Sequence, residues 1–441
     1  MKFSELRNLL NGEFLNFSQD FEIEEFTIDS RKATENSVFI PLKSNRDGHE
    51  FIQDALKNGS KGYLSERVLP YKNGILVRDS YRALVQIAKF KRSIPQTVIG
   101  ITGSSGKTST KELINFTLSG LYKTYATKGN LNNEIGVPLT LSNIPKDTQI
   151  AIIEKGAGKK DDIKYLMDIS NPDIGVLVSL GEAHIERFGS FDNIVKTKGQ
   201  IFDGVKFGIL PSNLNHYYRD KDIDFITFGD EGIIRLSGIQ ITEDGTEGVI
   251  SYKSDRIRLK IPIYSKAVFR NIGAVAGVLY ALELNPIKNL EILRQFKGFE
   301  GRGDIKKIGR YLILDESYNA NPSSVKNSIE SFEKLPGVKV YVMGDMLELG
   351  DFSEKLHLEV AKTFERSKID YILLFGREVE HIQRYLQGKK KVFIFQSKRE
   401  IGEFLEKLEY LDIKVMVKGS RGMKMEEVIE YLREKAKEDV L

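Results

Sequence analysis

The sequence predicts an α/β protein of three domains in which most strands are parallel. Residues 98–121 have the pattern of a buried strand, a glycine-rich turn and a helix with one apolar face, and the chain after residue 301 alternates strands and helices regularly. A shorter alternation of strands and helices precedes residue 96. We therefore expect a small N-terminal domain at 1–96, a central domain at 97–301 and a C-terminal domain at 302–441.

The composition excludes several classes of protein. The 441 residues include 66 basic and 62 acidic side chains, so the formal net charge of +4 gives no reason to expect a nucleic-acid partner. The chain has no cysteine, which excludes disulfides, thiolate metal sites and cysteine nucleophiles. No apolar run approaches the roughly 18 residues of a membrane span, and the N-terminus lacks a hydrophobic signal core. We expect a cytoplasmic protein without a membrane span, acting as a monomer.

The first domain shows strand patterns at 24–29, 37–42 and 62–65 and a helix pattern at 49–58. Polar residues follow two of these strands, at Asp29-Ser-Arg31 and Asp47-Gly-His49. Open α/β sheets place ligand contacts at such strand ends, whereas solvated loops are the alternative interpretation. A linker is expected at 93–97.

The glycine-rich turn that follows residue 101 predicts a site for a nucleoside triphosphate. Gly103 and Gly106 would let the backbone wrap around phosphate oxygens, Lys107 would bridge the outer phosphates, and Thr108 would hold Mg²⁺. The full phosphate-loop pattern has a glycine where this chain has Ile101, and a chance glycine-rich turn before a helix is the alternative. The apolar positions of the following helix are expected at 113, 114, 118 and 121.

Two later strands of the central domain end at candidate metal ligands. The strand at 149–153 is followed by Glu154, and the strand at 173–180 is followed by His184. If these strands are parallel, both side chains lie at the same edge of the sheet as the glycine-rich turn. From 225 to 263 the pattern changes to short alternating segments, which predict antiparallel hairpins, and a helix is expected at 269–284.

The third domain is predicted to be doubly wound and Rossmann-like. Its strands are expected at 311–314, 338–343, 371–375, 392–395 and 414–417. Its helices are expected at 323–335, 353–366, 379–386 and 425–435. No Gly-x-Gly-x-x-Gly follows its first strand, so the sequence does not predict a dinucleotide here.

Taken together, the motifs resemble those of the Mur ligases, the ATP-dependent amide-forming enzymes of peptidoglycan synthesis. The resemblance covers nearly the whole chain, and three of its motifs (residues 132–136, 318–322 and 345–350) are typical of the family member that adds a dipeptide. The motifs are Asp29-Ser-Arg31, Asp47-Gly-His49, Gly100-Ile-Thr-Gly-Ser-Ser-Gly-Lys-Thr108, Asn132-Asn-Glu-Ile-Gly-Val-Pro138, His184-Ile-Glu-Arg-Phe-Gly-Ser190, Gly301-Arg302, Ser317-Tyr-Asn-Ala-Asn-Pro322, Gly344-Asp-Met-Leu-Glu-Leu-Gly350 and Lys418-Gly-Ser-Arg-Gly-Met423.

The resemblance implies an N-terminal domain that binds a UDP-sugar, a central ATPase domain with a phosphate loop, and a C-terminal domain that binds the dipeptide and closes over ATP. It implies that D-alanyl-D-alanine is joined to UDP-N-acetylmuramoyl-tripeptide. The peptide carboxylate would attack the γ-phosphate of ATP to give an acyl phosphate and ADP. The dipeptide amine would then attack the acyl carbon and expel phosphate.

The resemblance also implies roles for single residues. Catalytic roles are implied for Lys107, His184, Lys198 and Arg302. Ligation of Mg²⁺, at two sites, is implied for Thr108, Glu154, His184 and Lys198 as its CO₂-derived carbamate. ATP binding is implied for Gly103, Ser104, Ser105, Gly106, Lys107, Thr108, Ser109, Asn271, Arg302 and Asp315. UDP-substrate binding is implied for Ser30, Arg31, Asp47, His49, Asn132 and Asn133, and contact with the dipeptide or the phosphates for Asn319, Asn321, Lys418, Ser420 and Arg421.

Several positions depart from the family pattern. Lys155 and Gly158 replace a methionine and an asparagine after Glu154, and Gln200 replaces a glutamate. Arg270 and Ala274 replace a histidine and an asparagine on either side of Asn271. A carbamate on Lys198 has a physical logic, because a free ammonium would repel a metal cation whereas the CO₂ adduct is an anion with two oxygen donors. Without the resemblance, Lys198 would be interpreted as a solvated helix lysine.

Two alternative functions stay open. A sibling enzyme of the same fold would add a single amino acid or would be a folylpolyglutamate synthetase, and the motif at 345–350 argues against it. A nucleotide-dependent switch or motor would hydrolyse ATP or GTP without an amine acceptor. Such a protein would not need Glu154, His184 and Lys198 to converge beyond the phosphate loop.

Overall fold

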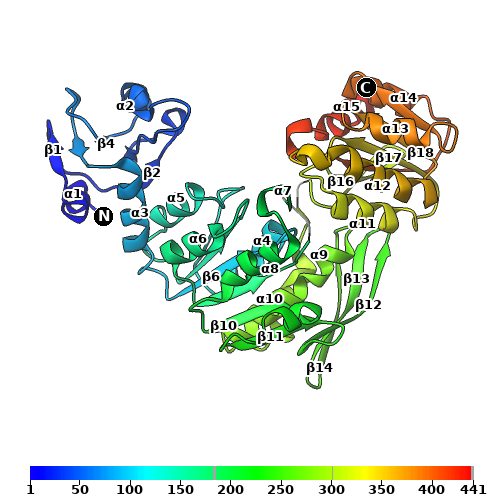
Figure 1. The fold of residues 1–441 in the computed structure, drawn as a ribbon, viewed down its shortest axis with the longest axis horizontal. Helices are drawn as coiled ribbons and strands as arrows, with labels where there is room; N and C mark the ends of the chain where they lie inside the picture. Colours follow the sequence, from blue (N-terminus) through cyan, green and yellow to red (C-terminus); the bar gives the residue numbers. More distant parts are fainter. Residues whose placement is uncertain (182–184, 300, 439–441) are drawn as a thin grey trace.

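The computed structural model describes residues 1–181, 185–299 and 301–438. Figure 1 shows three α/β units arranged along an open arc, with the N-terminus in the first and the C-terminus in the third. Each unit is built on its own sheet, with five, nine and six strands respectively. The predicted three-domain α/β fold is confirmed.

The N-terminal sheet has the strand order β1-β5-β4-β3-β2 and is parallel except between β1 and β5. Helix α3 connects it to the central domain, where Tyr81 donates a hydrogen bond to the Glu134 carbonyl at 2.8 Å and Arg92 donates one to the Asn171 carbonyl at 2.7 Å. The strands are β1 (Glu13–Leu15), β2 (Glu25–Thr27), β3 (Ser37–Phe39), β4 (Gly62–Ser65) and β5 (Gly74–Leu76). The helices are α1 (Phe3–Leu10), α2 (Ile52–Lys57) and α3 (Ser80–Lys91).

The central sheet has the order β14-β13-β12-β11-β10-β9-β6-β8-β7. It is parallel from β12 to β7 and antiparallel between β12, β13 and β14. Its strands are β6 (Thr97–Thr102), β7 (Thr124–Ala126), β8 (Ile150–Glu154), β9 (Ile174–Leu177), β10 (Phe207–Pro211), β11 (Asp224–Gly229), β12 (Ile234–Thr242), β13 (Gly245–Tyr252) and β14 (Asp255–Ile261).

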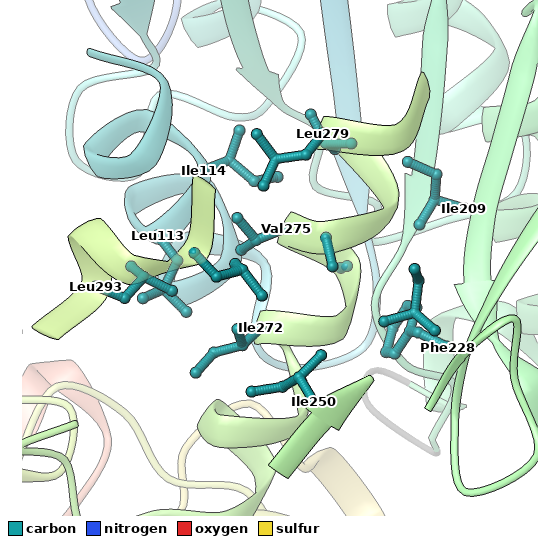
Figure 2. Packing of buried hydrophobic residues seen from close by; sticks show 14 of the residues in the cluster. Leu113, Ile114, Ile209, Phe228, Ile250, Ile272, Val275, Leu279 and Leu293 are labelled. Atoms are coloured by element: carbon teal, nitrogen blue, oxygen red, sulfur yellow. The ribbon is translucent and has the colours of Figure 1, made fainter. Parts of the chain in front are cut away.

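Helix α4, which follows the phosphate loop, packs against helix α10 of the central domain. Figure 2 shows Leu113 and Ile114 of α4 packed against Val275 and Leu279 of α10, and all four side chains are buried. Helix α4 begins directly after the loop, so this apolar contact fixes the helix end that faces a ligand. The helices are α4 (Lys107–Ser119), α5 (Gly136–Ser142), α6 (Asp162–Ser170), α7 (Ile185–Phe188), α8 (Phe191–Gly199), α9 (Lys266–Arg270) and α10 (Ile272–Ala281).

The C-terminal sheet has the order β15-β16-β20-β17-β18-β19 and is parallel except between β15 and β16. The strands are β15 (Asp304–Ile308), β16 (Tyr311–Glu316), β17 (Val338–Gly344), β18 (Tyr371–Phe375), β19 (Val392–Phe395) and β20 (Ile413–Lys418). The helices are α11 (Pro322–Phe332), α12 (Ser353–Arg366), α13 (Glu380–Leu386), α14 (Lys398–Glu406) and α15 (Glu426–Glu438).

The structure corrects several details of the predicted elements. Helix α4 ends at Ser119, so Leu121 lies beyond it and is 49 % exposed rather than part of the apolar face. The predicted hairpin region begins with β11, which is parallel to both its neighbours; only β12 to β14 form antiparallel pairs. The helix expected at 269–284 is divided at Asn271, and strand β10 and helix α14 are among the elements for which the sequence predicted no range. In the described parts of the chain, no helix is long and apolar enough to cross a membrane.

Candidate active site

The phosphate loop lies between β6 and α4, at the centre of the carboxyl edge of the sheet. Ile101 is fully buried inside β6, so the loop starts two residues later, at Gly103. Gly106 has φ of +78°, and a β-carbon there would lie 2.8 Å from Nδ2 of Asn271. The backbone N–H of Ser104 donates to the Ser179 carbonyl at 3.0 Å. The loop is therefore held in a shape that only glycine permits at position 106.

Lys107 is the first residue of α4 and its side chain folds back over the loop. Its Nζ donates a hydrogen bond to the Gly103 carbonyl at 2.8 Å. Burial lowers the pKa of Lys107; the negative charge of Glu154 raises it and the positive charge of Arg302 lowers it further. An ammonium with cationic neighbours at the N-terminus of a helix is suited to binding a polyphosphate.

Glu154, at the end of β8, places a carboxylate beside the phosphate loop. Its Oε1 accepts hydrogen bonds from Thr108 Oγ1 at 3.0 Å and from Asn132 Nδ2 at 2.9 Å. Its Oε2 is buried and has no hydrogen-bond partner among the described residues. Burying a carboxylate oxygen without a partner costs free energy unless a cation or a water molecule binds it. The Glu154 carboxylate therefore suits a divalent cation that prefers oxygen ligands.

The expected convergence of Glu154 with the phosphate loop is confirmed, because β8 and β9 flank β6 and all three strands are parallel. His184 lies outside the described residues. Among the residues that the structure describes, no group of three or more histidine and acidic side chains forms a metal site by itself. The described metal candidates are thus Thr108, Glu154 and Lys198.

Lys198, on α8, reaches the same carbonyl as Lys107. Its Nζ donates to the Gly103 carbonyl at 3.3 Å, and the residue is only 2 % exposed. Burial, reinforced by the charge of Lys107, lowers the pKa of Lys198 to about 7, although Asp162 acts in the opposite direction. A substantial fraction of this amine is therefore neutral near neutral pH, which a solvated helix lysine would not be.

A cavity of about 1690 Å³ lies between the central and C-terminal domains and contains these groups. The C-terminal side brings three loops together at the carboxyl ends of β16, β17 and β20. There Lys418 pairs with Glu316 at 2.8 Å, and Ser420 Oγ accepts a hydrogen bond from the Leu347 N–H at 2.9 Å. The predicted residues that line the cavity are 103–109, Asn132, Asn133, Glu154, Lys198, Asn271, Arg302, Asn319, Asn321, Lys418, Ser420 and Arg421.

Of the predicted residues that the structure describes, five do not line this cavity. Asp315 is buried beside it, where its Oδ1 accepts hydrogen bonds from Ser317 and its other oxygen pairs with Lys306. The other four belong to the N-terminal domain: Ser30, Arg31, Asp47 and His49. Among the described residues, none before Gly103 lines the cavity.

His49 has an internal structural role in the N-terminal domain. Its Nδ1 lies 2.6 Å from Asp47 Oδ1, its Nε2 accepts from the Glu66 N–H at 3.0 Å, and its side chain is 1 % exposed. Arg31 pairs with Asp29 at 2.9 Å but its side chain is 85 % exposed, so it is accessible to a ligand. His49 can therefore act on a ligand only by orienting Asp47.

One side of the cavity is formed by segments that the sequence did not predict as part of a site. Residues 211–214 begin at the last residue of β10, residues 228–231 span the end of β11, and residues 266–268 open α9. Glu316, at the end of β16, was also missed. Had β10 been recognised, the rule that ligands bind at the carboxyl ends of parallel strands would have found the first of these segments.

Comparisons with known proteins agree with this arrangement. Residues 101–279 match the Mur ligase middle domain, and residues 301–421 match the domain described as the Mur ligase, glutamate ligase domain. The UDP-N-acetylmuramoyl-tripeptide–D-alanyl-D-alanine ligase of Bacillus subtilis (strain 168) is 34% identical over 431 residues, covering 92% of each chain.

Solved structures give the same result. A crystal structure of MurF from Acinetobacter baumannii matches with a TM-score of 0.88 at 28% identity and covers 98% of both chains. MurF ligase from Thermotoga maritima in complex with ADP matches with a TM-score of 0.83 at 29% identity, covering 94% of this chain and 98% of that one.

Proposed function

Because the chain belongs to the Mur ligase family, we propose that it is an ATP-dependent ligase that joins D-alanyl-D-alanine to UDP-N-acetylmuramoyl-tripeptide. The reaction passes through an acyl phosphate, formed when the peptide carboxylate attacks the γ-phosphate of ATP and releases ADP. The dipeptide amine then attacks the acyl carbon, phosphate leaves, and the amine loses a proton. The product is an amide in a precursor of peptidoglycan.

The observation that carries this proposal is the shared cavity between two domains. One wall holds the phosphate loop, and the other holds the ends of β16, β17 and β20. A carboxylate and a triphosphate repel each other, so a site that joins them needs concentrated positive charge. Lys107 and Arg302 both supply that charge, and the charge of Arg302 already depresses the pKa of Lys107.

We assign Thr108 and Glu154 to Mg²⁺. The buried Oε2 of Glu154 has no hydrogen-bond partner in the described chain, and the Thr108 hydroxyl lies next to the same carboxylate. When bound, Mg²⁺ would neutralise phosphate charge during transfer. We also propose Lys198 and His184 as ligands of a second Mg²⁺.

We propose that Lys198 acts as its carbamate. Carbamate formation requires a neutral amine, and burial lowers the pKa of Lys198 to about 7. The neutral amine attacks CO₂ and loses a proton to give an anion; counted from the ammonium form, two protons are released in all. That change removes the repulsion between Lys198 and Lys107 and supplies oxygen donors for a metal ion.

We assign the other ligands by domain, with the division at 1–96, 97–301 and 302–441. The N-terminal domain would bind the UDP group through the exposed Arg31, together with Ser30 and Asp47. Asn319, Asn321, Lys418, Ser420 and Arg421 would bind the dipeptide or the phosphates. The C-terminal domain would close over ATP and bring Arg302 to the phosphates. ATP and a UDP-linked substrate suit a cytoplasmic enzyme, and one chain forms the whole cavity, which suits a monomer.

The test is to incubate the protein with ATP, Mg²⁺ and UDP-N-acetylmuramoyl-tripeptide, with and without D-alanyl-D-alanine, and to follow phosphate release and product mass. We expect product only with the dipeptide. Product with single amino acids instead would indicate a sibling ligase, and ATP or GTP hydrolysis that ignores the dipeptide would indicate a nucleotide switch. Lys107→Ala is the control, and we expect it to fold normally and make no product.

A further inference from the structure

The guanidinium carbon of Arg302 lies over the ring of Tyr318. The Cζ atom of Arg302 is 3.5 Å from the ring centroid, and both residues line the cavity. This distance is van der Waals contact, well inside the roughly 6 Å over which a cation is attracted to an aromatic face. The Cζ atom of Arg421 lies 6.0 Å from the same ring. Tyr318 therefore contacts the arginine whose charge acts on Lys107 of the phosphate loop, and it lies near a second arginine on the C-terminal side.

Backbone hydrogen bonds hold the segment of Arg302 beside that of Tyr318. The N–H of Tyr318 donates to the Gly301 carbonyl at 3.1 Å, and the N–H of Gly303 donates to the Asp315 carbonyl at 2.7 Å. Gly301 has φ of +70°, and a β-carbon there would lie 3.3 Å from Cβ of Tyr318. The segment that carries Arg302 is thus fastened to the strand end that carries Tyr318, and the two would move as one body.

The electrostatics explain why Arg302 needs such a partner. Arg302 is partly buried, and its charge acts on Lys107 across the cavity. Two cations that face each other repel, and an arginine side chain loses considerable entropy when it is held in one rotamer. The negative face of the Tyr318 ring offsets both the repulsion from Lys107 and the loss of side-chain entropy. A ring stacked on the guanidinium does not cover the N–H groups at its edge.

We propose that Tyr318 is a positioning residue for Arg302: its ring fixes the plane of the guanidinium so that the N–H edges meet the phosphates as the domains close. The inference rests on the proposed function, because it requires Arg302 to act on the phosphoryl group that is transferred. We assign this role to the ring of Tyr318 rather than to its hydroxyl, which also interacts favourably with the Arg302 guanidinium.

The test is a double-mutant cycle measured by the rate of ligation. Tyr318→Phe keeps the ring and should stay close to the wild-type kcat. Tyr318→Leu should lower kcat by about 2- to 30-fold, the range expected for a cation–π contact. In an Arg302→Met background, Tyr318→Leu should have no further effect, because the group that it positions is gone. A purely structural role would give the same loss in both backgrounds and would overturn the inference.

Two additional variants keep the test valid if Tyr318→Leu folds poorly. Tyr318→Phe with increasing numbers of ring fluorines keeps the shape but weakens the negative ring face, so kcat should fall stepwise; a constant kcat would overturn the inference. Tyr385→Leu is the matched control, since Lys389 lies 3.8 Å from that ring, outside the cavity, and its kcat should be unchanged. Failure of the wild type to make product would refute the proposed function, whereas wild-type kcat in Tyr318→Leu would refute only this inference.

Discussion

Lys198 and Lys155 both bury an amine in the central domain, but only Lys198 faces the cavity. Burial lowers the pKa of each to about 7. The Lys198 amine reaches the phosphate loop, whereas the Lys155 amine has no hydrogen-bond partner among the described residues and does not line the cavity. A strongly lowered pKa therefore does not identify a reactive lysine, because the amine must also be accessible to a reagent.

The opposite orientation of Lys155 follows from its place in the chain. It comes directly after Glu154, and consecutive residues of an extended chain point to opposite faces. On its own face the amine lies over Gly100 of β6, where a β-carbon would come within 2.6 Å of Nζ. A glycine thus makes room for an amine that no acidic residue in the described part of the chain neutralises, and the charge of Arg92 further disfavours its protonation.

The largest effect should come from removing the amine that faces the cavity. Lys198→Ala should lower kcat at least about 100-fold, because it removes both the amine and any carbamate formed on it. Acetate or another short carboxylic acid should restore part of the rate, since a small anion can occupy the space that the side chain leaves. Steady-state rates with and without acid check this.

Lys107 and Lys155 provide the controls for this experiment. Lys107→Ala should lose activity as severely but gain nothing from added acid, because its missing group is a cation. Lys155→Met should keep most of the activity without any acid. Full activity of Lys198→Ala in the absence of acid would remove this residue from the site.

The same pair of lysines shows what could be predicted from the sequence. The phosphate loop, Glu154 and the regular β/α alternation were predictable because strand ends and glycine spacing are local features. The burial of Lys198 was not predictable, because it results from α8 packing over Gly103, nearly a hundred residues away in the chain. The same limit applies to His49, whose spacing suggests a ligand contact while its neighbours Asp47 and Glu66 enclose it.

A smaller effect, on stability, should come from the lysine on the other face. Lys155→Met should raise the free energy of unfolding by up to about 4 kcal/mol at pH 7, because it replaces a buried amine without partners by an apolar side chain of similar size. Urea unfolding of the wild type and the variant measures the difference. An unchanged or lower stability would mean that the amine has a partner after all.

The pH dependence of that difference provides a second check. The pKa of Lys155 is about 7 in the folded protein and near 10.4 in the unfolded chain, so the unfolded chain binds more protons between these values. Wild-type stability should therefore rise relative to the variant from pH 7 to pH 10. The advantage of Lys155→Met should be full below pH 7 and should nearly vanish by pH 10.

The smallest effect, and one of opposite sign, is expected at a third buried lysine. Lys111 on α4 is also fully buried, but its amine donates to the Thr127 carbonyl and pairs with Glu112 at 2.8 Å. Lys111→Met would leave that carbonyl without its donor, which should lower the free energy of unfolding by about 1–2 kcal/mol. Urea unfolding under the conditions used for Lys155→Met compares the two directly. Stabilisation by both substitutions would show that burial alone, rather than the presence of a partner, sets the cost of a lysine in this domain.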